Sequence, residues 1–325
     1  MPSRADLHSH STFSDGRLTP TQLIDLAYRN GVRLMALTDH DITDGLPEAF
    51  EAAARHEDFT LIPGIEMSTD IPGNEVHILG HFIDWQDADF QRELEHLQDS
   101  RVGRARGMVE KLIELGKPVS WDRVQAIAGD GAVGRPHIAL ALVEAGHVST
   151  VNEAFDLYIS RNGPAYVERE KMTPPEVVQM LLAVGGLATL AHPRDLGHLE
   201  DLLADLKGAG LTGMEVYYQD YGPEEVERLR RLAEKFGLLP LGGSDFHGLG
   251  GPQQREPGNI PLPWEPVQRL LDLAQERDAL KRTQYARPGR WAQTSTPCSA
   301  PAIPTWRRGW PAAAARRRSA RNAWS

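Results

Sequence analysis

Histidine and carboxylate residues occur together in short clusters along this 325-residue chain. Imidazole nitrogens and carboxylate oxygens are ligands for divalent ions such as Zn²⁺, Mn²⁺ and Fe²⁺. A single histidine is more often structural or exposed than a ligand, so one cluster alone would carry little weight. Clusters that recur at intervals along the chain indicate one multinuclear metal site assembled from several loops. They lie at residues 6–10, 14–16, 38–41, 64–66, 75–77, 191–193 and 244–247.

The spacing inside two of these clusters strengthens the prediction of a metal site. His8 and His10 are two residues apart, which on an extended segment projects both imidazole rings to the same side. Asp15 follows them after a turn, and Asp245 and His247 repeat the spacing of two far along the chain. We therefore expect these five side chains to converge.

The remaining histidines carry weaker signals. His77 and His81 are four residues apart on an expected strand, which places both on one face, so a ligand role and a structural role stay open for His81. Four others lie on polar stretches and are expected to be structural or exposed: His56, His96, His147 and His198.

Short apolar runs alternate with amphipathic stretches over much of the sequence. The expected strands are residues 34–38, 60–65, 76–83, 187–191, 213–217 and 239–243. The expected helices between them are residues 20–30, 46–56, 174–184, 198–208 and 223–236. This alternation predicts an α/β protein with a parallel sheet, open or closed into a barrel. Several clusters directly follow a strand, where βα barrels carry their active groups.

A helical insertion interrupts the alternation. Its expected helices are residues 90–115, 121–128, 135–144 and 151–160. We expect this insertion to cap the mouth of the barrel. The predicted organisation is a barrel of residues 1–98 and 165–280, an insertion of residues 99–164 and a tail of residues 281–325.

Composition excludes several classes of protein. Cys298 is the only cysteine, which excludes disulfides within the chain and thiolate metal sites and fits a reducing cytoplasm. No apolar run approaches a membrane span, and the first residues are too polar for a signal peptide. We therefore expect a cytoplasmic protein without a membrane partner; nothing in the sequence indicates an obligate protein partner.

Charge is unevenly distributed along the chain. Residues 281–325 contain ten Lys and Arg and no Asp or Glu, so the first 280 residues carry a net charge of −20 against −10 for the whole chain. An acidic body is a poor platform for duplex DNA, whose binding rests on many phosphate contacts. The Pro-, Ala- and Arg-rich tail is expected to be disordered or to result from a frameshift. Its sequence indicates no function.

Three motifs resemble the polymerase and histidinol phosphatase (PHP) family: residues 6–16 (DLHSHSTFSDG), 37–41 (LTDHD) and 243–248 (GSDFHG). The resemblance extends over roughly residues 4–278. It implies a distorted (β/α)7 barrel that holds up to three divalent ions. The ligands that it implies are His8, His10, Glu66 and Asp245 for one ion, Asp15, His40 and His192 for a second, and Glu66, His77 and His247 for a third. Every ligand position is filled by a residue able to bind metal.

The insertion resembles that of nucleoside 3′,5′-bisphosphate phosphatases, a subgroup that includes 5′→3′ exonucleases on short RNA. Arg101 and Arg104 lie at i and i+3, on one helix face. Arg135 stands where a helix begins, and free N–H groups there favour an anion. Arginine donors match phosphate geometry, although solvated helix charges are the alternative. His137 is expected to orient a phosphate or leaving group, or to serve as a cap or core residue.

The expected reaction is hydrolysis of a phosphomonoester of a nucleoside 3′,5′-bisphosphate, such as adenosine 3′,5′-bisphosphate, by a hydroxide bridging two metals. Trimming of short RNA from its 5′ end is a further expected activity. Mn²⁺ is the expected ion, with Fe²⁺, Zn²⁺ and Mg²⁺ as alternatives. The expected catalytic residues are Asp15, His40, His192 and His247. The residues expected to bind substrate are Asp15, His40, Arg101, Arg104, Arg135 and His137.

Three other functions remain open from the sequence. A histidinol-phosphate phosphatase explains the metal ligands but leaves the arginines of the insertion without a purpose. A metal-dependent amidohydrolase commonly carries a lysine that bridges two metals, and no lysine occupies a ligand cluster. A non-catalytic metal-binding module fits less well, because the ligand set is complete.

Overall fold

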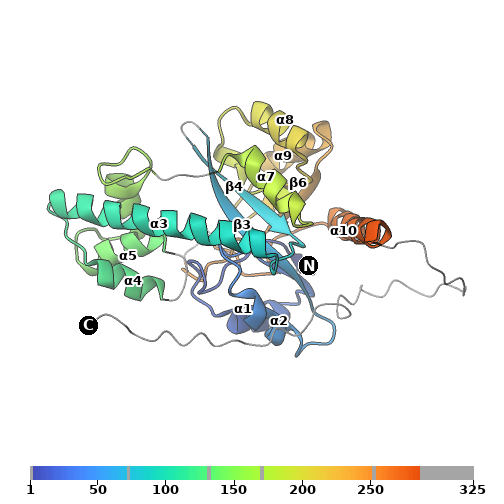
Figure 1. Ribbon diagram of the computed structural model, residues 1–325, viewed down its shortest axis with the longest axis horizontal. Helices are drawn as coiled ribbons and strands as arrows, with labels where there is room; N and C mark the ends of the chain where they lie inside the picture. Colours follow the sequence, from blue (N-terminus) through green and yellow to red (C-terminus); the bar gives the residue numbers. More distant parts are fainter. Residues whose placement is uncertain (1–2, 72–73, 130–132, 169–171, 251–253, 286–325) are drawn as a thin grey trace, which may run out of the picture. The chain divides into compact units, whose positions relative to one another are not determined.

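The computed structural model describes residues 3–71, 74–129, 133–168, 172–250 and 254–285. Seven strands in sequence order form one sheet that curls into a nearly closed barrel (Figure 1). The strands are β1 (Ala5–Asp6), β2 (Leu34–Leu37), β3 (Thr60–Ile71), β4 (Asn74–His81), β5 (Leu187–Leu190), β6 (Gly213–Tyr218) and β7 (Leu239–Gly243). The α/β class and the barrel predicted from the sequence are confirmed.

The barrel closes just beyond its first and last strands. Ser9 forms a parallel bridge with Phe246. The backbone N–H of His10 donates to the carbonyl of Phe246 at 3.1 Å, and the N–H of Asp245 donates to the carbonyl of His8 at 2.9 Å. These bonds place the clusters at residues 6–10 and 244–247 side by side.

Strand β4 runs against its neighbours, so the prediction of a parallel sheet is wrong at this strand. It pairs antiparallel with both β3 and β5, whereas the remaining neighbours are parallel. Ile71 lies opposite Asn74, and the two intervening residues cannot hold the crossover helix that a parallel connection requires. The reversal brings the first residues of β4, including His77, to the end of the barrel where the parallel strands finish.

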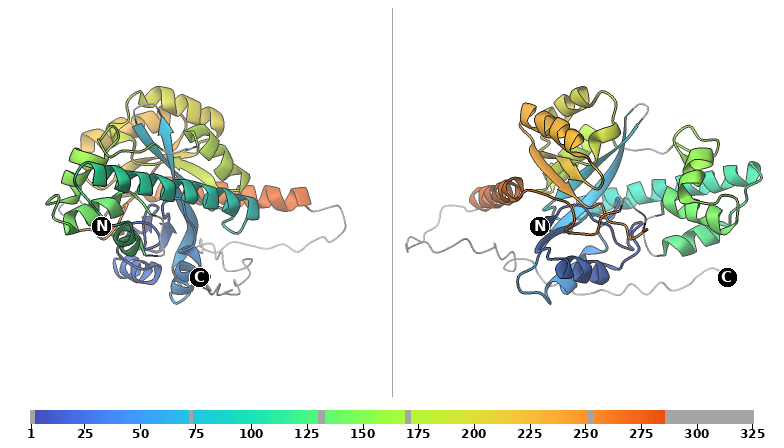
Figure 2. Two further views of the ribbon diagram at one scale, coloured as in Figure 1. Left: turned by 60° about the vertical axis from the view of Figure 1, so that its left-hand side comes forward. Right: turned by 180° about the vertical axis from the view of Figure 1, so that it is seen from behind.

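Helices surround the sheet and cover its apolar faces (Figures 1 and 2). At the start of the first helix, Thr19 and Gln22 form a reciprocal capping box, which satisfies N–H groups that have no partner inside the helix. The helices of the barrel are α1 (Pro20–Arg29), α2 (Leu46–Ala53), α7 (Pro174–Ala183), α8 (Leu199–Ala209), α9 (Pro223–Lys235) and α10 (Trp264–Tyr285), with the short 3-10 helix η2 (Pro193–Asp195).

The insertion consists of α3 (Ala88–Glu114), α4 (Trp121–Ala128), α5 (Arg135–Glu144), α6 (Val151–Ala154) and the π-helix η1 (Phe155–Ile159). Helix α3 links it to the barrel. Phe90 and Leu97 of this helix belong to a core of the barrel, whereas Ala105 and Met108 belong to the core of the insertion. The predicted boundary at residues 98 and 99 falls within this continuous helix and stays a prediction.

The expected tail lies mostly outside the described residues. Residues 281–285 continue helix α10, so the helix runs past the expected boundary at residue 280, and residues 286–325 are not among those described. None of the described helices has the length and apolarity needed to cross a membrane.

Candidate metal centre and substrate cavity

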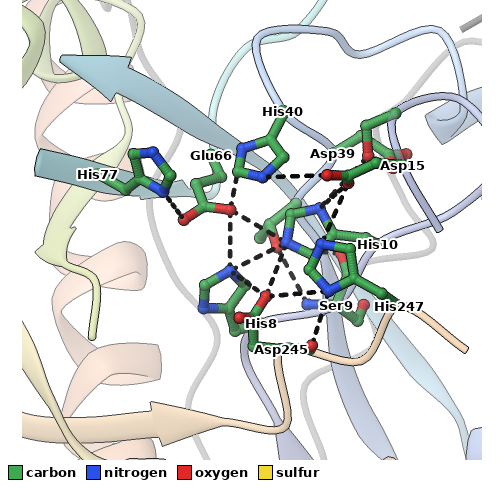
Figure 3. A network of polar contacts seen from close by, with 12 residues as sticks. His8, Ser9, His10, Asp15, Asp39, His40, Glu66, His77, Asp245 and His247 are labelled. Atoms are coloured by element: carbon green, nitrogen blue, oxygen red, sulfur yellow. Dashed lines mark hydrogen bonds and ion pairs between the residues drawn. The ribbon is translucent and has the colours of Figure 1, made fainter. Parts of the chain in front are cut away.

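Four buried side chains meet where the first and last strands approach each other (Figure 3). We call His8, His10, Glu66 and Asp245 the first group; each can offer a ligand atom within 4.8 Å of the others. The Nε2 atoms of His8 and His10 are 3.1 Å apart, and each lies 3.0 Å from Oε2 of Glu66. Oδ1 of Asp245 lies 3.0 Å from Nε2 of His10 and 3.2 Å from Nε2 of His8.

The donor set of the first group fits a divalent ion. Oδ1 of Asp245 is buried and makes no hydrogen bond with any described residue, although two imidazole nitrogens face it. Buried polar atoms without hydrogen bonds are costly unless a cation or proton lies among them. Mixed nitrogen and oxygen donors suit Mn²⁺, Fe²⁺ or Zn²⁺.

The other carboxylate oxygen of Glu66 faces a second group, formed by Glu66, His77 and His192. His40 lies beside this group as well, since its ligand atom is within 4.8 Å of those of Glu66 and His77. Nδ1 of His77 lies 2.8 Å and Nε2 of His192 lies 3.1 Å from Oε1 of Glu66. Glu66 therefore presents one oxygen to each of two adjacent groups, as a carboxylate that bridges two cations would.

A third group consists of Asp15, His40 and His247, together with His10, which it shares with the first group. Nε2 of His247 is 3.1 Å from Oδ1 of Asp15, and Nε2 of His40 is 3.8 Å from Oδ2. Oδ1 of Asp15 and Nδ1 of His40 are buried without a hydrogen bond to the described residues. This group also has the composition of a cation site.

The structure thus brings all nine expected ligands together but exchanges two of them between groups. The resemblance implied His192 beside Asp15 and His247 beside His77. In the structure Ala191 donates its N–H to the carbonyl of His77 at 3.0 Å, because β4 and β5 are neighbours, and this holds the next residue, His192, at the second group. His247 instead follows β7 and lies beside the segment after β1. Ligation by these nine residues stays a proposal.

Electrostatic interactions among the side chains of the centre keep Asp15, Glu66 and Asp245 ionised. Burial would raise the pKa of Glu66, but neighbouring imidazoles, chiefly those of His40 and His8, hold it well below its usual range. Burial lowers the pKa of His40 to about 3, against the opposing effect of the Glu66 and Asp15 charges. Burial also acts to lower the pKa of His247, yet neighbouring carboxylates, Asp15 foremost, raise it to about 10. A cation that binds His247 must therefore displace a proton.

Backbone strain occurs at two of the expected ligands. His192 has a φ of 28° and Asp245 a φ of 48°, a region that residues other than glycine rarely adopt and that costs on the order of 1–3 kcal/mol per residue. Both residues lie just after a strand, where the sharp turn of the chain directs the side chain to the centre.

Carboxylates that were not expected to act as ligands hold the expected ligands in place. Asp39 accepts hydrogen bonds from the hydroxyl groups of Ser11 and Ser14, both at 2.7 Å. Oγ of Ser14 in turn lies 3.3 Å from Nδ1 of His10. Glu215 of β6 was not predicted from the sequence as part of the centre. The one feature of the sequence that could have indicated it is a single carboxylate within a short apolar strand.

A cavity of about 160 Å³ lies beside the second and third groups, between the barrel and helices α3 and α5. Metal-binding candidates form one wall and three arginines of the insertion form another. The lining residues are Ser14, Asp15, His40, Glu75, His77, Arg101, Arg104, Ala105, Met108, Val133, Gly134, Arg135, Pro136, His137, Ile138 and Phe155.

The arginines lie against protein groups rather than free in solvent. Arg101 donates to the carbonyl of His40 at 3.2 Å and is 3.3 Å from Oδ2 of Asp41. Arg104 is buried and donates to a backbone carbonyl at 3.1 Å. Arg135 forms an ion pair with Glu75. The guanidinium groups are thus held by protein partners at the cavity wall.

His137 has the capping role that was one of those left open by the sequence, and it also lines the cavity. Its Nδ1 accepts a hydrogen bond from the N–H of Gly134 at 3.0 Å, at the start of α5. Burial lowers its pKa, and the charge of Arg101 lowers it further against the opposing effect of Asp15. A neutral imidazole therefore faces the cavity.

Comparison with known proteins identifies the family of this chain. Residues 6–100 match the PHP domain. The chain is 37% identical over 277 residues to a 5′-3′ exoribonuclease of Haemophilus influenzae, covering 84% of this chain and 96% of that protein. It is 34% identical over 274 residues to a 3′,5′-nucleoside bisphosphate phosphatase of Chromobacterium violaceum, covering 82% and 96%. A Bifidobacterium adolescentis crystal structure, assigned to the metal-dependent phosphoesterases, superposes with a TM-score of 0.75 at 31% identity, covering 84% and 98%.

Barrel, side-chain groups and relatives together define a hydrolase of the metal-dependent phosphoesterase class. The chain belongs to the PHP family. The resemblance identified from the three sequence motifs is therefore confirmed.

Proposed function

We propose that this enzyme hydrolyses a phosphomonoester of nucleoside 3′,5′-bisphosphates, such as adenosine 3′,5′-bisphosphate, and also trims short RNA from its 5′ end. The observation that carries the proposal is a single cavity with candidate metal groups on one wall and three arginines on another. Two separate places for anionic groups suit a substrate with two phosphates. The names of the relatives support the same substrate class.

Three divalent ions are proposed, one at each group, with Mn²⁺ as the first candidate because the donors are nitrogen and oxygen. When bound, such ions activate water as a nucleophile at neutral pH and neutralise charge on phosphoryl oxygens. Asp15 and His40 lie on the cavity wall, where they would contact the phosphate that is cleaved.

The residues of the insertion bind and orient the substrate in this proposal. Arg101, Arg104 and Arg135 would hold the phosphate that is not cleaved through charge-assisted hydrogen bonds. His137 would present its imidazole to a phosphate or to the leaving oxygen. Protonation of that oxygen is assigned to His192 or His247, both of which are partly exposed at the centre.

Histidinol phosphate carries one phosphate and gives the arginine wall no partner, so it is the weaker substrate candidate. A non-catalytic module is not supported, because the relatives are named as phosphatase and exoribonuclease. The small cavity and the acidic body favour a nucleotide or an RNA end over duplex DNA. A cytoplasmic location stays part of the proposal, based on the single cysteine.

A substrate panel assayed with Mn²⁺ tests the proposal. We expect phosphate release mainly from adenosine 3′,5′-bisphosphate, less from a 5′-phosphorylated RNA oligomer and little from histidinol phosphate. Arg101→Ala and Arg135→Ala should each raise KM for the bisphosphate about tenfold or more, because a hydrogen bond to a charged group contributes about 1.5–3 kcal/mol. Arg106→Ala, at an exposed site on α3, is the matched control.

Two results would overturn the assignment. Efficient hydrolysis of histidinol phosphate that is insensitive to both arginine substitutions would refute the proposed substrate. Full turnover by Asp245→Asn would refute the role of the first group, because that change removes one of its anionic oxygens.

A further inference from the structure

Glu215 is a buried carboxylate that belongs to none of the three groups and yet lies between two of them. It stands in the middle of β6 with no exposed surface. Its neighbours Met214 and Val216 belong to the apolar core around the barrel, and alternation along a strand directs Glu215 to the opposite face. A buried carboxylate is costly unless its charge has specific partners, so the contacts of both oxygens are informative.

Each oxygen of Glu215 contacts a different group. Oε1 lies 3.1 Å from Nδ1 of His8, which belongs to the first group. Oε2 accepts a hydrogen bond of 2.7 Å from the backbone N–H of His192, which belongs to the second group. One side chain on β6 therefore connects segments that follow β1 and β5.

The contact with His8 determines which ring nitrogen can bind a cation. When Nδ1 carries the proton and donates it to Glu215, Nε2 keeps its lone pair. That nitrogen faces Glu66 and Asp245. A carboxylate behind a ligating imidazole fixes the ring and increases its basicity.

The contact with His192 acts on the backbone instead. His192 has a φ of 28°, a strained conformation that persists only where its surroundings hold it. The hydrogen bond from its N–H to Glu215 provides such a constraint. It fixes the turn that brings Nε2 of His192 to 3.1 Å from Oε1 of Glu66.

We propose that Glu215 is a positioning residue that couples the first and second metal sites, while neither of its two contacts involves Asp15, His40 or His247 of the third group. The inference rests on the proposed metal-dependent function. Loss of the carboxylate should weaken ion binding at two sites by about tenfold to a hundredfold, the range typical of residues behind metal ligands.

Glu215→Gln provides the test, because glutamine has the same shape. If its amide oxygen accepts from the N–H of His192, its NH₂ group faces Nδ1 of His8 and favours the tautomer that places a proton on Nε2. Mn²⁺ is titrated into metal-free protein by calorimetry, and bound ions are counted by elemental analysis. We expect two ions to weaken and the third to bind as in the wild type. Glu224→Gln on α9 is the matched control.

Companion variants locate the weakened sites. His8→Ala and His192→Ala should each weaken one of the two ions that Glu215→Gln weakens. His247→Ala should weaken the ion that Glu215→Gln leaves unchanged. If Glu215→Gln does not fold, as judged by circular dichroism, Glu215→Asp replaces it, since a carboxylate one methylene shorter cannot reach both partners and should weaken at least one of the two ions.

Three results would overturn the inference. Ion binding by Glu215→Gln that equals the wild type would show that the carboxylate has no effect on the ligands. An equal loss of all three ions, or a loss of stability in the metal-free protein without a change in ion affinity, would indicate a purely structural role. Failure of the wild type itself to bind ions would instead refute the proposed function.

Discussion

Imidazole and carboxylate side chains are the metal donors available to this chain, which is why Asp245 and His8 could be predicted as ligands from residue type. Neighbours in space decide how the ligands are grouped. His192 lies by Glu66 because β5 pairs with β4, and His247 lies by Asp15 because the barrel closes there.

His81 shows that spacing alone cannot separate a ligand from a structural histidine. It shares a strand with His77, yet its Nε2 lies 2.9 Å from the carbonyl oxygen of Leu7. It belongs to none of the ligand groups found among the described residues. The role that the sequence left open is therefore a structural one.

The pKa of His81 predicts a contribution to acid sensitivity. Burial lowers this pKa to about 4 from an ordinary value of 6.5. Between these values the unfolded chain binds the proton and the folded chain does not, so stability is full above pH 6.5 and falls as the pH decreases towards 4. The loss from this residue between pH 7 and 5 is about 2 kcal/mol.

Urea unfolding of metal-free protein at both pH values measures this effect. His81→Gln, which has no titrating group but can still donate to Leu7, should lose about 2 kcal/mol less than the wild type over this interval. Equal losses in the two proteins would contradict the assignment.

Strands and helices bring these residues within reach of one another. The reversal of β4 places Glu75 and His77, which lie in the first half of that strand, beside the ends of parallel strands. The close approach of β7 to the segment after β1 is equally important. A Cβ atom added to Gly243 would lie 2.5 Å from both the backbone N and the Cβ of His8.

Gly243→Ala should therefore separate β7 from the segment that carries His8. We expect a decrease of about 1–3 kcal/mol in the free energy of unfolding, typical of overpacking, together with weaker Mn²⁺ binding. Gly208→Ala on α8 is the control, since its Cβ would meet no atom within 4 Å and alanine favours a helix. Chemical unfolding and metal titration measure both effects. Normal ion binding by Gly243→Ala would show that this close approach is dispensable.

The ion pair between Glu75 of β4 and Arg135 of α5 links the barrel to the insertion. A substrate phosphate must compete with Glu75 for this guanidinium. Glu75→Gln should lower KM for adenosine 3′,5′-bisphosphate by up to about fivefold, because a partly exposed pair contributes up to about 1 kcal/mol. KM for a nucleoside monophosphate should change less.

Steady-state kinetics at low and high salt measure this prediction, and the difference between the proteins should shrink as salt screens the pair. A higher KM in Glu75→Gln would mean that Glu75 orients Arg135 for the substrate instead of competing with it.

Across the molecule, the candidate metal centre joins residues that follow the first and the last strands of the barrel. The first group takes His8 and His10 from beyond β1, Glu66 from β3 and Asp245 from beyond β7. An ion held there binds the folded chain and has no equivalent site in the unfolded chain. Ion binding should therefore stabilise the whole fold.

Chelation tests this consequence. Removal of the ions should lower the free energy of unfolding by about 3–4 kcal/mol when the free ion had been at a hundred to a thousand times its dissociation constant. Calorimetry with chelator, and then with Mn²⁺ restored, measures the shift in Tm. Asp245→Asn should show a smaller shift than the wild type. An unchanged Tm in the wild type would contradict tight binding at the first group.

The sequence by itself determined the features that are contained in short segments. These are the set of candidate ligands, most helices and strands, the helical insertion and the arginines at 101, 104 and 135. Residue type and local periodicity specify such features because they depend on neighbours along the chain.

Only the tertiary structure decided which atoms face the same point in space. The direction of β4, the exchange of His192 and His247 between groups and the two contacts of Glu215 all depend on which strands are neighbours and in which register. Partners such as Glu215 and His8 lie far apart along the chain, and local patterns carry no information about such distant pairing. The types of residue in the sequence therefore determine which chemistry the centre can perform, while the pairing of strands in the barrel determines its geometry.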